Sequence, residues 1–170
     1  MIKNRSEFPT DELGKISKKL SAVSETVSTA ESVTSGYLQF LLSQMLQASE
    51  IYKGGITAYT LQEKVNLLKI DEKEAKKCDC VSSGISNKMA LHTAELFGTD
   101  WGIAVTGYAT PVQESGFKLF AFFSFAYRNK IIHTEKIELN PDVKGPAAQI
   151  HYAEHIITAF KNKCSKHHPA

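Results

Sequence analysis

Ser32 is the side chain whose type and place in the sequence best fit a chemical role. It lies within the stretch TAESVTSG at residues 29–36. The β-branched residues at 26–30 predict a short buried strand, and apolar residues at helical spacing over 37–46 predict a helix. Ser32 is therefore expected on the turn between them, where free N–H groups and the helix dipole can stabilise a phosphate or an oxyanion. The alternative is that Ser32 and Thr34 only cap the helix, as serine and threonine commonly do.

Two more stretches place small or polar residues beside predicted strands. Gly54 and Gly55 precede a predicted strand at 56–60. A glycine pair there either makes a turn or lets a ligand approach the backbone closely. Thr106 and Gly107 follow an apolar run that is typical of a central strand covered on both faces. Open α/β sheets bind their ligands at such strand ends.

One stretch resembles a metal-binding motif. The sequence HYAEH at 151–155 matches H-x-x-E-H, in which a histidine pair at i and i+4 can share a metal ion. A catalytic zinc needs a third protein ligand, and only fifteen residues follow His155. Both histidines also lie off the apolar stripe of the predicted helix. We therefore expect a solvent-facing helix surface here, with no metal and no cofactor.

Composition argues against several classes of function. The 170 residues suit one domain, 1–170, and the apolar fraction of 42% and charged fraction of 22% are ordinary for a globular protein. A net charge of +2 with only two arginines, Arg5 and Arg128, gives little means of gripping nucleic acid. No apolar run reaches membrane-spanning length, and residues 1–8 hold no secretory segment. We expect a protein that binds neither nucleic acid nor a membrane.

The cysteines indicate a reducing compartment. They are Cys78, Cys80 and Cys164, an odd number that includes a C-x-C pair. This arrangement fits neither a disulfide framework nor a zinc ribbon. Reduced thiols are the simplest account, so we predict a cytoplasmic location.

Hydrophobic periodicity predicts alternating strands and helices, followed by a hairpin. A helix from residue 61 places Tyr59 at a strand end and Lys64 in the first turns of that helix. His92 falls on the apolar face of a helix that Gly98 ends, where a hydrogen-bonded structural role is the commoner one. The other expected elements are a helix at about 9–23, a charged surface segment at 71–79, strands at 119–127 and 131–139, a closing helix over 147–160 and a polar tail from about 161.

This order of elements predicts an α/β fold. We expect a three-layer α/β/α sandwich with a mixed, mostly parallel sheet of about five strands that ends in an antiparallel hairpin. The phenylalanine-rich strand of that hairpin and its edge strand offer apolar surface, which favours a homo-oligomer.

Four motifs, in the same order, resemble those of the CinA C-terminal domain family, the competence/damage-inducible protein A family. The stretch TAESVTSG at 29–36 resembles the family signature TAESCTGG. GGITAY at 54–59, followed by KV and LL at 64–68, is similar to G-G-x-x-A-Y-x-x-x-x-K-x-x-L-L. Val81-Ser82 is similar to the family's V-S helix start, and AVTG at 104–107 matches a strand end. Together these motifs cover roughly the whole chain and are jointly specific.

The resemblance implies hydrolysis of the carboxamide of nicotinamide mononucleotide to nicotinate mononucleotide and ammonia. A small-molecule nucleotide is then the expected partner, and Ser32 is the candidate nucleophile. No histidine lies near a motif, so Lys64 is the candidate base, as in Ser–Lys hydrolases. It must act as a neutral amine, which requires burial or a nearby cation to lower its pKa. The candidate substrate-binding residues are Glu31, Thr34, Ser35, Gly36, Gly54, Gly55, Thr106 and Gly107.

Tyr59 completes the candidate catalytic group that the resemblance implies. It lies five residues before Lys64 and could relay the proton or orient the amine. We expect the Ser32 hydroxyl and the Lys64 amine within direct or single-water hydrogen-bond reach, with Tyr59 adjoining.

The sequence departs from the family where the substrate would be held. The family reads G-I-A-G-P, whereas this chain has GYATP at 107–111, and Ser35 stands where the signature has a glycine. After the last strand the family carries G-D-R, whereas this chain reads NPDV at 140–143 with no arginine following. Lys144 is at best a point-charge substitute for that arginine.

Two interpretations follow. One is an amidohydrolase that acts on nicotinamide mononucleotide or a related small amide. The other is a catalytically degenerate family member that persists as a small-molecule-binding or assembly module. Longer family members carry an N-terminal domain similar to molybdopterin-binding proteins, for which no length remains here. We therefore expect any activity in this domain alone.

Overall fold

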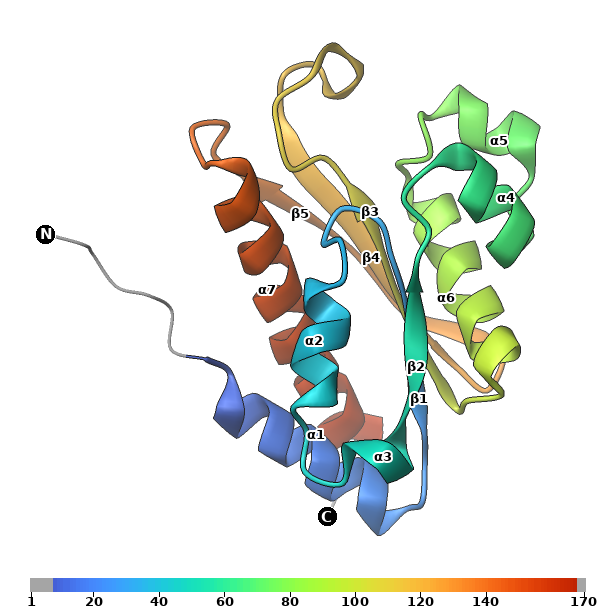
Figure 1. Ribbon diagram of the computed structural model, residues 1–170, viewed down its shortest axis with the longest axis vertical. Coiled ribbons are helices and arrows are strands. Elements are labelled where there is room, and N and C mark those ends of the chain that lie inside the picture. The colour runs from blue at the N-terminus through green and yellow to red at the C-terminus, as the bar shows by residue number, and fades with distance from the viewer. Residues whose placement is uncertain (1–7, 168–170) are drawn as a thin grey trace, which may run out of the picture.

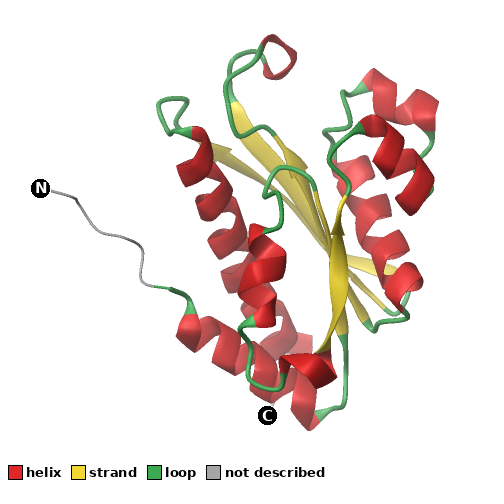
Figure 2. Cartoon of the chain, in the orientation of Figure 1, coloured by secondary structure: helices red, strands yellow, loops and turns green. Residues whose placement is uncertain are grey.

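A five-stranded mixed sheet lies between two layers of helices in the computed structural model, which describes residues 8–167 (Figures 1 and 2). The strands are β1 Val27–Glu31, β2 Tyr52–Thr57, β3 Trp101–Gly107, β4 Leu119–Tyr127 and β5 Lys130–Leu139, in the sheet order β2-β1-β3-β4-β5. Strand β1 pairs in parallel with β2 and β3, whereas β4 runs antiparallel to β3 and β5. The predicted α/β fold is confirmed, with the parallel pairs at one end of the sheet and the hairpin at the other.

The helices divide between the two faces of the sheet. They are α1 Thr10–Ala22, α2 Tyr37–Ser43, α3 Ala48–Ile51, α4 Leu61–Leu68, α5 Glu72–Lys77, α6 Ser83–Phe97 and α7 Gly145–His167. Figure 1 shows α1, α2 and α7 on one side of the sheet and α4, α5 and α6 on the other. Side chains from both helical layers can therefore lie close to the ends of the central strands.

Local capping sets where the site-bearing helices begin and end. The Thr60 hydroxyl accepts from the Glu63 N–H at 3.3 Å and starts α4, and the Ser82 hydroxyl accepts from the Ile85 N–H at 3.2 Å and starts α6. Gly98 ends α6 with a φ of +62°, a conformation that glycine adopts without strain. The predicted placing of Lys64 in the first turns of a helix is confirmed.

Several element boundaries differ from the prediction. Strand β2 begins at Tyr52, so the glycine pair lies inside it instead of before it. Part of the charged segment at 71–79 forms α5, where an Asp71 cap accepts from the Glu74 N–H. The expected polar tail from about 161 continues α7 as far as His167, because Cys164 is buried on its inner face. Residues 168–170 lie outside the described chain.

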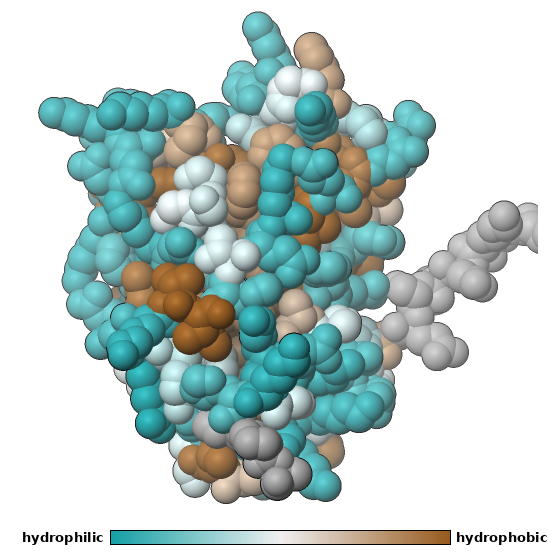
Figure 3. All heavy atoms as spheres, turned by 180° about the vertical axis from the view of Figure 1, so that it is seen from behind, coloured by the Kyte–Doolittle hydropathy of each residue, from teal (hydrophilic) through white to brown (hydrophobic). Residues whose placement is uncertain are grey.

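The hairpin does not offer the apolar surface that we expected. Phe123 and Phe125 are fully buried. Phe120 and Phe122 are half-buried, and the Lys136 amine lies over the Phe120 ring at 4.4 Å from its centroid. Figure 3 shows a largely hydrophilic face with hydrophobic atoms in separate patches. The structural reason given for a homo-oligomer is therefore wrong, because these rings pack inward or beneath a lysine stem.

Gly102 lets α6 pack directly against β3. A Cβ at Gly102 would lie 2.0 Å from the carbonyl oxygen of Ala90. We expect Gly102→Ala to lower the free energy of unfolding by about 3 kcal/mol, because the helix must shift. Urea denaturation measures the change. Gly14→Ala is the control: its Cβ would meet nothing within 4 Å on α1, so a gain of about 0.5 kcal/mol is expected. Equal effects of the two changes would contradict the close approach.

Candidate active site

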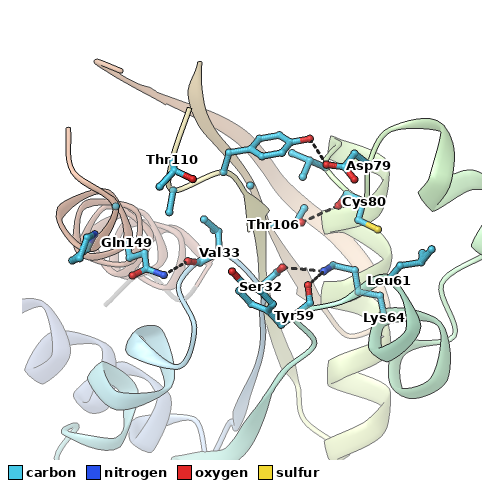
Figure 4. A pocket seen from close by; sticks show the side chains of 16 residues that line it. Ser32, Val33, Tyr59, Leu61, Lys64, Asp79, Cys80, Thr106, Thr110 and Gln149 are labelled. Carbon is cyan, nitrogen blue, oxygen red and sulfur yellow. Dashed lines mark hydrogen bonds between the residues drawn. The ribbon is translucent and has the colours of Figure 1, made fainter. Parts of the chain in front are cut away.

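A pocket of about 460 Å³ opens at the carboxyl ends of β1 and β3, between the start of α7 and the α4–α5 side of the molecule (Figure 4). Gln149 and Thr110 lie on one side of it and Asp79 and Cys80 on the other, with Ser32 between them. The lining residues are Ser32, Val33, Tyr59, Leu61, Lys64, Asp79, Cys80, Val81, Thr106, Gly107, Tyr108, Ala109, Thr110, Gly145, Pro146 and Gln149. The volume is within the range of small-molecule sites.

Ser32 and Lys64 meet at the bottom of this pocket. The Lys64 Nζ lies 2.9 Å from the Ser32 Oγ, so the predicted contact between the two side chains is confirmed. Ser32 is 7% exposed and Lys64 is 2% exposed, although lysine is among the side chains least often buried. The amine also donates to the carbonyl oxygens of Ala58 at 2.8 Å and Tyr59 at 3.2 Å.

Burial shifts the pKa of Lys64 toward the neutral amine. The pKa lies below the ordinary value of 10.5, and the nearby Cys80 and Asp79 oppose this shift only in part. A neutral amine has two N–H donors and one lone pair. With the Ala58 and Tyr59 carbonyls taking the two donors, the lone pair is left for the Ser32 hydroxyl proton. The arrangement can therefore deprotonate Ser32 without a histidine.

Glu31 does not face the pocket, and its role differs from the one we expected. It is fully buried, and its carboxylate accepts from the N–H groups of Gly36 at 3.1 Å, Leu38 at 3.1 Å and Gln39 at 2.7 Å. The Thr34 hydroxyl donates to the same carboxylate at 2.5 Å. Glu31 therefore ties the loop after Ser32 to the start of α2.

This tie overturns the predicted anion site at the start of α2. The helix begins at Tyr37, five residues after Ser32, and Glu31 already occupies its first N–H groups. A carboxylate at a helix N-terminus satisfies the free donors and the dipole together. The alternative that Ser32 and Thr34 cap α2 is also wrong, because Glu31 accepts those hydrogen bonds.

Tyr59 contacts Lys64 through its backbone and not through its hydroxyl. Its side chain is 66% exposed at the pocket, and its carbonyl oxygen accepts from the Lys64 amine. The expected proton relay through the phenol is therefore not formed in this structure. The residue does help to orient the amine, by an interaction that any side chain at this position would preserve.

The remaining expected binding residues separate into two groups. Thr106 and Gly107 line the pocket, and the Thr106 hydroxyl donates to the Cys80 carbonyl at 2.8 Å. Thr34, Ser35 and Gly36 belong to the loop tied by Glu31 and are not among the lining residues.

Gly54 and Gly55 lie within β2, away from the pocket lining, and the protein's own side chains fill the space beside them. A Cβ at Gly55 would lie 2.1 Å from the Thr29 Oγ1, and one at Gly54 would lie 3.0 Å from the Phe97 ring. The glycines therefore allow internal packing and not the approach of a ligand.

Sequence reasoning missed the pocket residues that come from distant segments. Asp79 falls at the end of the expected charged segment, Cys80 belongs to a cysteine pair with no predicted role, and Gln149 lies in the expected closing helix with no role of its own. The Gln149 amide donates to the Val33 carbonyl at 2.9 Å and to the Ser35 hydroxyl at 3.3 Å, so α7 also holds the loop after Ser32. Asp79 and Cys80 have successive positive φ angles of +48° and +61°, which define a constrained turn. No sequence motif predicts this turn.

The H-x-x-E-H stretch has a structural partner. His155 contacts the Glu135 carboxylate at 2.8 Å across the gap between α7 and β5. Within residues 8–167, no cluster of three or more histidine, cysteine or acidic side chains is placed to hold a metal ion. In the same range no helix is both long and apolar enough to cross a membrane.

Fold and site together define an α/β domain with a buried Ser–Lys pair at the carboxyl ends of its parallel strands. The family model of the CinA C-terminal domain matches residues 11–149, and the chain belongs to that family. A CinA-like protein of Synechocystis sp. is 45% identical over 87 residues, which make up 51% of this chain and 21% of that protein. A CinA-like protein of Gloeothece citriformis is 40% identical over 96 residues, or 56% of this chain and 23% of that protein. The chain thus spans less than a quarter of the length of these relatives.

Solved structures share the fold. The CinA superfamily protein from Enterobacter cloacae superposes with a TM-score of 0.87 at 19% identity, covering 97% of each chain. The one from Klebsiella pneumoniae 700603 gives a TM-score of 0.85 at 23% identity, covering 92% of this chain and 98% of that one. At these identities the likeness establishes the arrangement of strands and helices.

Removing the Glu31 carboxylate tests the tie that holds the loop after Ser32. We expect Glu31→Ala to lower the free energy of unfolding by about 3 kcal/mol, because the N–H groups that it accepts from lose their partner. Chemical denaturation measures this loss. Glu50→Ala, at an exposed carboxylate on α3, is the matched control and should change stability by less than about 0.5 kcal/mol. A loss no larger than that of the control would refute the tie.

The lowered pKa of Lys64 makes stability depend on pH. Between the pKa in the folded protein and the value near 10.5 in the unfolded chain, the unfolded chain binds more protons. The free energy of unfolding of the native protein should therefore rise with pH across that window, relative to Lys64→Met. Denaturation at several pH values up to 10.5 measures the difference. Lys53→Met, at an exposed lysine, should show no such trend. A difference between wild type and Lys64→Met that does not vary with pH would contradict the lowered pKa.

Proposed function

We propose that this domain is an amidohydrolase that converts the carboxamide of nicotinamide mononucleotide, or of a related small amide, to the acid and ammonia. The observation that carries the proposal is the 2.9 Å contact between the Ser32 hydroxyl and the buried Lys64 amine at the bottom of an open pocket. A serine hydroxyl is a weak nucleophile unless a base lies within hydrogen-bond reach. The family to which the chain belongs supports the same reaction class.

The first half of the reaction forms an acyl-enzyme. Lys64 accepts the hydroxyl proton while the Ser32 oxygen attacks the carboxamide carbon, which becomes tetrahedral and carries an oxyanion. Lys64, now protonated, returns that proton to the departing nitrogen as the C–N bond breaks, and ammonia leaves. The ester on Ser32 and a neutral Lys64 remain.

The second half uses water. Lys64 takes a proton from a water molecule as its oxygen attacks the ester carbon, and it gives the proton back to the Ser32 oxygen when the C–O bond breaks. The products are the carboxylic acid and the restored enzyme. The Ser32 N–H donates to the Val105 carbonyl at 3.1 Å, the Ser35 N–H to the Ser32 carbonyl at 3.2 Å and the Gly36 N–H to the Glu31 carboxylate at 3.1 Å. We therefore assign the oxyanion to the N–H groups of Val33 and Thr34, which precede the part of the loop that Glu31 occupies.

The pocket leaves the substrate's phosphate without an arginine. Arg128, the one arginine within residues 8–167, lies in the turn between β4 and β5, at the opposite ends of β1 and β3 from the pocket. There it contacts Glu25 at 3.2 Å and Asp100 at 3.7 Å. For this reason the proposal covers related small amides as well as the mononucleotide. A cytoplasmic location and a homo-oligomer remain predictions, and every side chain used in the mechanism comes from a single chain.

Ammonia release from nicotinamide mononucleotide tests the proposal. We expect Ser32→Ala and Lys64→Met each to lower kcat/KM by about a thousandfold, because the nucleophile or its base is lost. Tyr59→Phe is the matched control and should stay within about twofold of wild type, because only its carbonyl contacts Lys64. The wild-type kcat/KM should rise with pH as Lys64 loses its proton, with a midpoint below 10.5.

Two outcomes would contradict the proposal. Wild-type release no faster than that of Ser32→Ala, for the mononucleotide and for small amides alike, would favour the degenerate binding or assembly module. Full activity in Lys64→Met would show that another group removes the Ser32 proton.

A further inference from the structure

The turn after Ser32 has two adjacent N–H groups that the protein itself does not use. Val33 and Thr34 are the central residues of this turn, which the Ser35 N–H closes by donating to the Ser32 carbonyl at 3.2 Å. Among residues 8–167, no acceptor takes a hydrogen bond from the Val33 N–H or the Thr34 N–H. Successive free N–H groups in a turn form a site for a negative oxygen, provided that their direction is fixed.

The side-chain amide of Gln149 on α7 holds this turn at two points. Its Nε2 donates to the Val33 carbonyl at 2.9 Å and to the Ser35 hydroxyl at 3.3 Å. An amide nitrogen has two N–H donors, so the turn uses both of them. Ser35 has a φ of +50°, a region that glycine adopts far more readily, and its hydroxyl also donates to the Ser32 carbonyl at 3.4 Å. Serine therefore gives α7 a contact that glycine at this position could not make.

The contact with the Val33 carbonyl determines the direction of the Thr34 N–H. These two groups belong to one peptide unit, which is trans, as are all peptide bonds of the described chain. The carbonyl and the N–H of a planar trans peptide point in opposite directions. Because the carbonyl is held toward α7, the Thr34 N–H points away from it. Figure 4 shows Val33 between Gln149 and Ser32, so this N–H faces the side of the pocket where Ser32 lies.

We propose that Gln149 is a positioning residue for the oxyanion, which orients the Thr34 N–H through the Val33 carbonyl without contacting the substrate. This inference rests on the proposed amidohydrolase function and adds to it a residue that acts on the transition state. A hydrogen bond to the carbonyl also polarises the peptide and strengthens its N–H as a donor. Gln149 lines the pocket, so the competing interpretation is a direct contact with the substrate.

Pyridine-3-boronic acid tests the positioning role apart from turnover. The Ser32 oxygen forms a bond to boron and its proton passes to Lys64, so boron becomes tetrahedral and anionic while its other bonds stay intact. Boron-11 NMR distinguishes this adduct from the free trigonal acid, and Ser32→Ala should form none. We expect Gln149→Met to weaken the adduct about tenfold, less than the loss of about a hundredfold or more when an oxyanion donor is removed outright, because the N–H remains but is no longer held.

A planar ligand separates positioning from contact with the substrate. In a Ser32→Ala background, the affinity for nicotinamide should change by less than about twofold when Gln149→Met is added. In turnover, Gln149→Met should lower kcat about tenfold and leave KM unchanged, since only the transition state loses an interaction. Gln39→Met is the matched control: the Gln39 amide on α2 donates to the Thr57 hydroxyl at 3.0 Å, outside the pocket lining, and its loss should change none of these values.

The outcomes separate this inference from the proposed function. An adduct as tight in Gln149→Met as in wild type, a nicotinamide affinity that falls in step with it, or no binding of either probe by the parent proteins would overturn the positioning role. A weakened adduct with unchanged nicotinamide affinity, in a protein whose wild type releases no ammonia, would support the role and contradict the amidohydrolase. If Gln149→Met does not fold, Gln149→Glu, which keeps the size and loses the donor, is judged by the same results.

Discussion

The burial of one lysine amine against a serine hydroxyl and two backbone carbonyls is the interaction on which the rest of the site depends. An ammonium group taken out of water is unfavourable unless its donors are satisfied. The Ala58 and Tyr59 carbonyls and the Ser32 hydroxyl satisfy all three donors of the Lys64 ammonium. They satisfy the neutral amine equally well, since its lone pair can accept the hydroxyl proton. The pocket therefore accommodates both protonation states of Lys64, which the proposed role of Lys64 as a base requires.

Holding that contact needs a rigid loop on the serine side. Ser32 follows β1 directly, and two elements far apart in the sequence fix the residues after it. Glu31 binds the loop to α2, and Gln149 binds it to α7 through the Val33 carbonyl. Because the loop is held at both points, the Ser32 hydroxyl stays directed at Lys64. Covalent catalysis requires a nucleophile that is positioned in advance in this way.

The far side of the pocket is built differently. There the chain at Asp79 and Cys80 adopts a constrained backbone that hydrogen bonds from β3 and α5 hold in place. Constrained turns of this kind are found where a side chain must be presented at a fixed angle. The Ser–Lys pair thus lies where both helical layers contribute to one cavity, and Lys64 is on the same side of it as Asp79 and Cys80 (Figure 4).

The sequence by itself determined the order and type of most elements, because amphipathic spacing and caps are local signals. The start of α4 at Thr60 and of α6 at Ser82 and the hairpin of β4 and β5 follow from residues within a few positions of each boundary. The resemblance to the family's motifs singled out Ser32 and Lys64 as candidates, and the fold brings their side chains to within 2.9 Å of each other.

Only the tertiary structure decided what each neighbour of that pair does. Whether a carboxylate faces a ligand or its own backbone depends on which donors surround it, and for Glu31 these belong to the next helix. Whether a tyrosine acts through its hydroxyl or its carbonyl depends on the direction of its side chain, and Tyr59 points to solvent. Asp79, Tyr108 and Gln149 come together from three separate segments because the sheet and its two helical layers converge there, and no local pattern encodes that convergence.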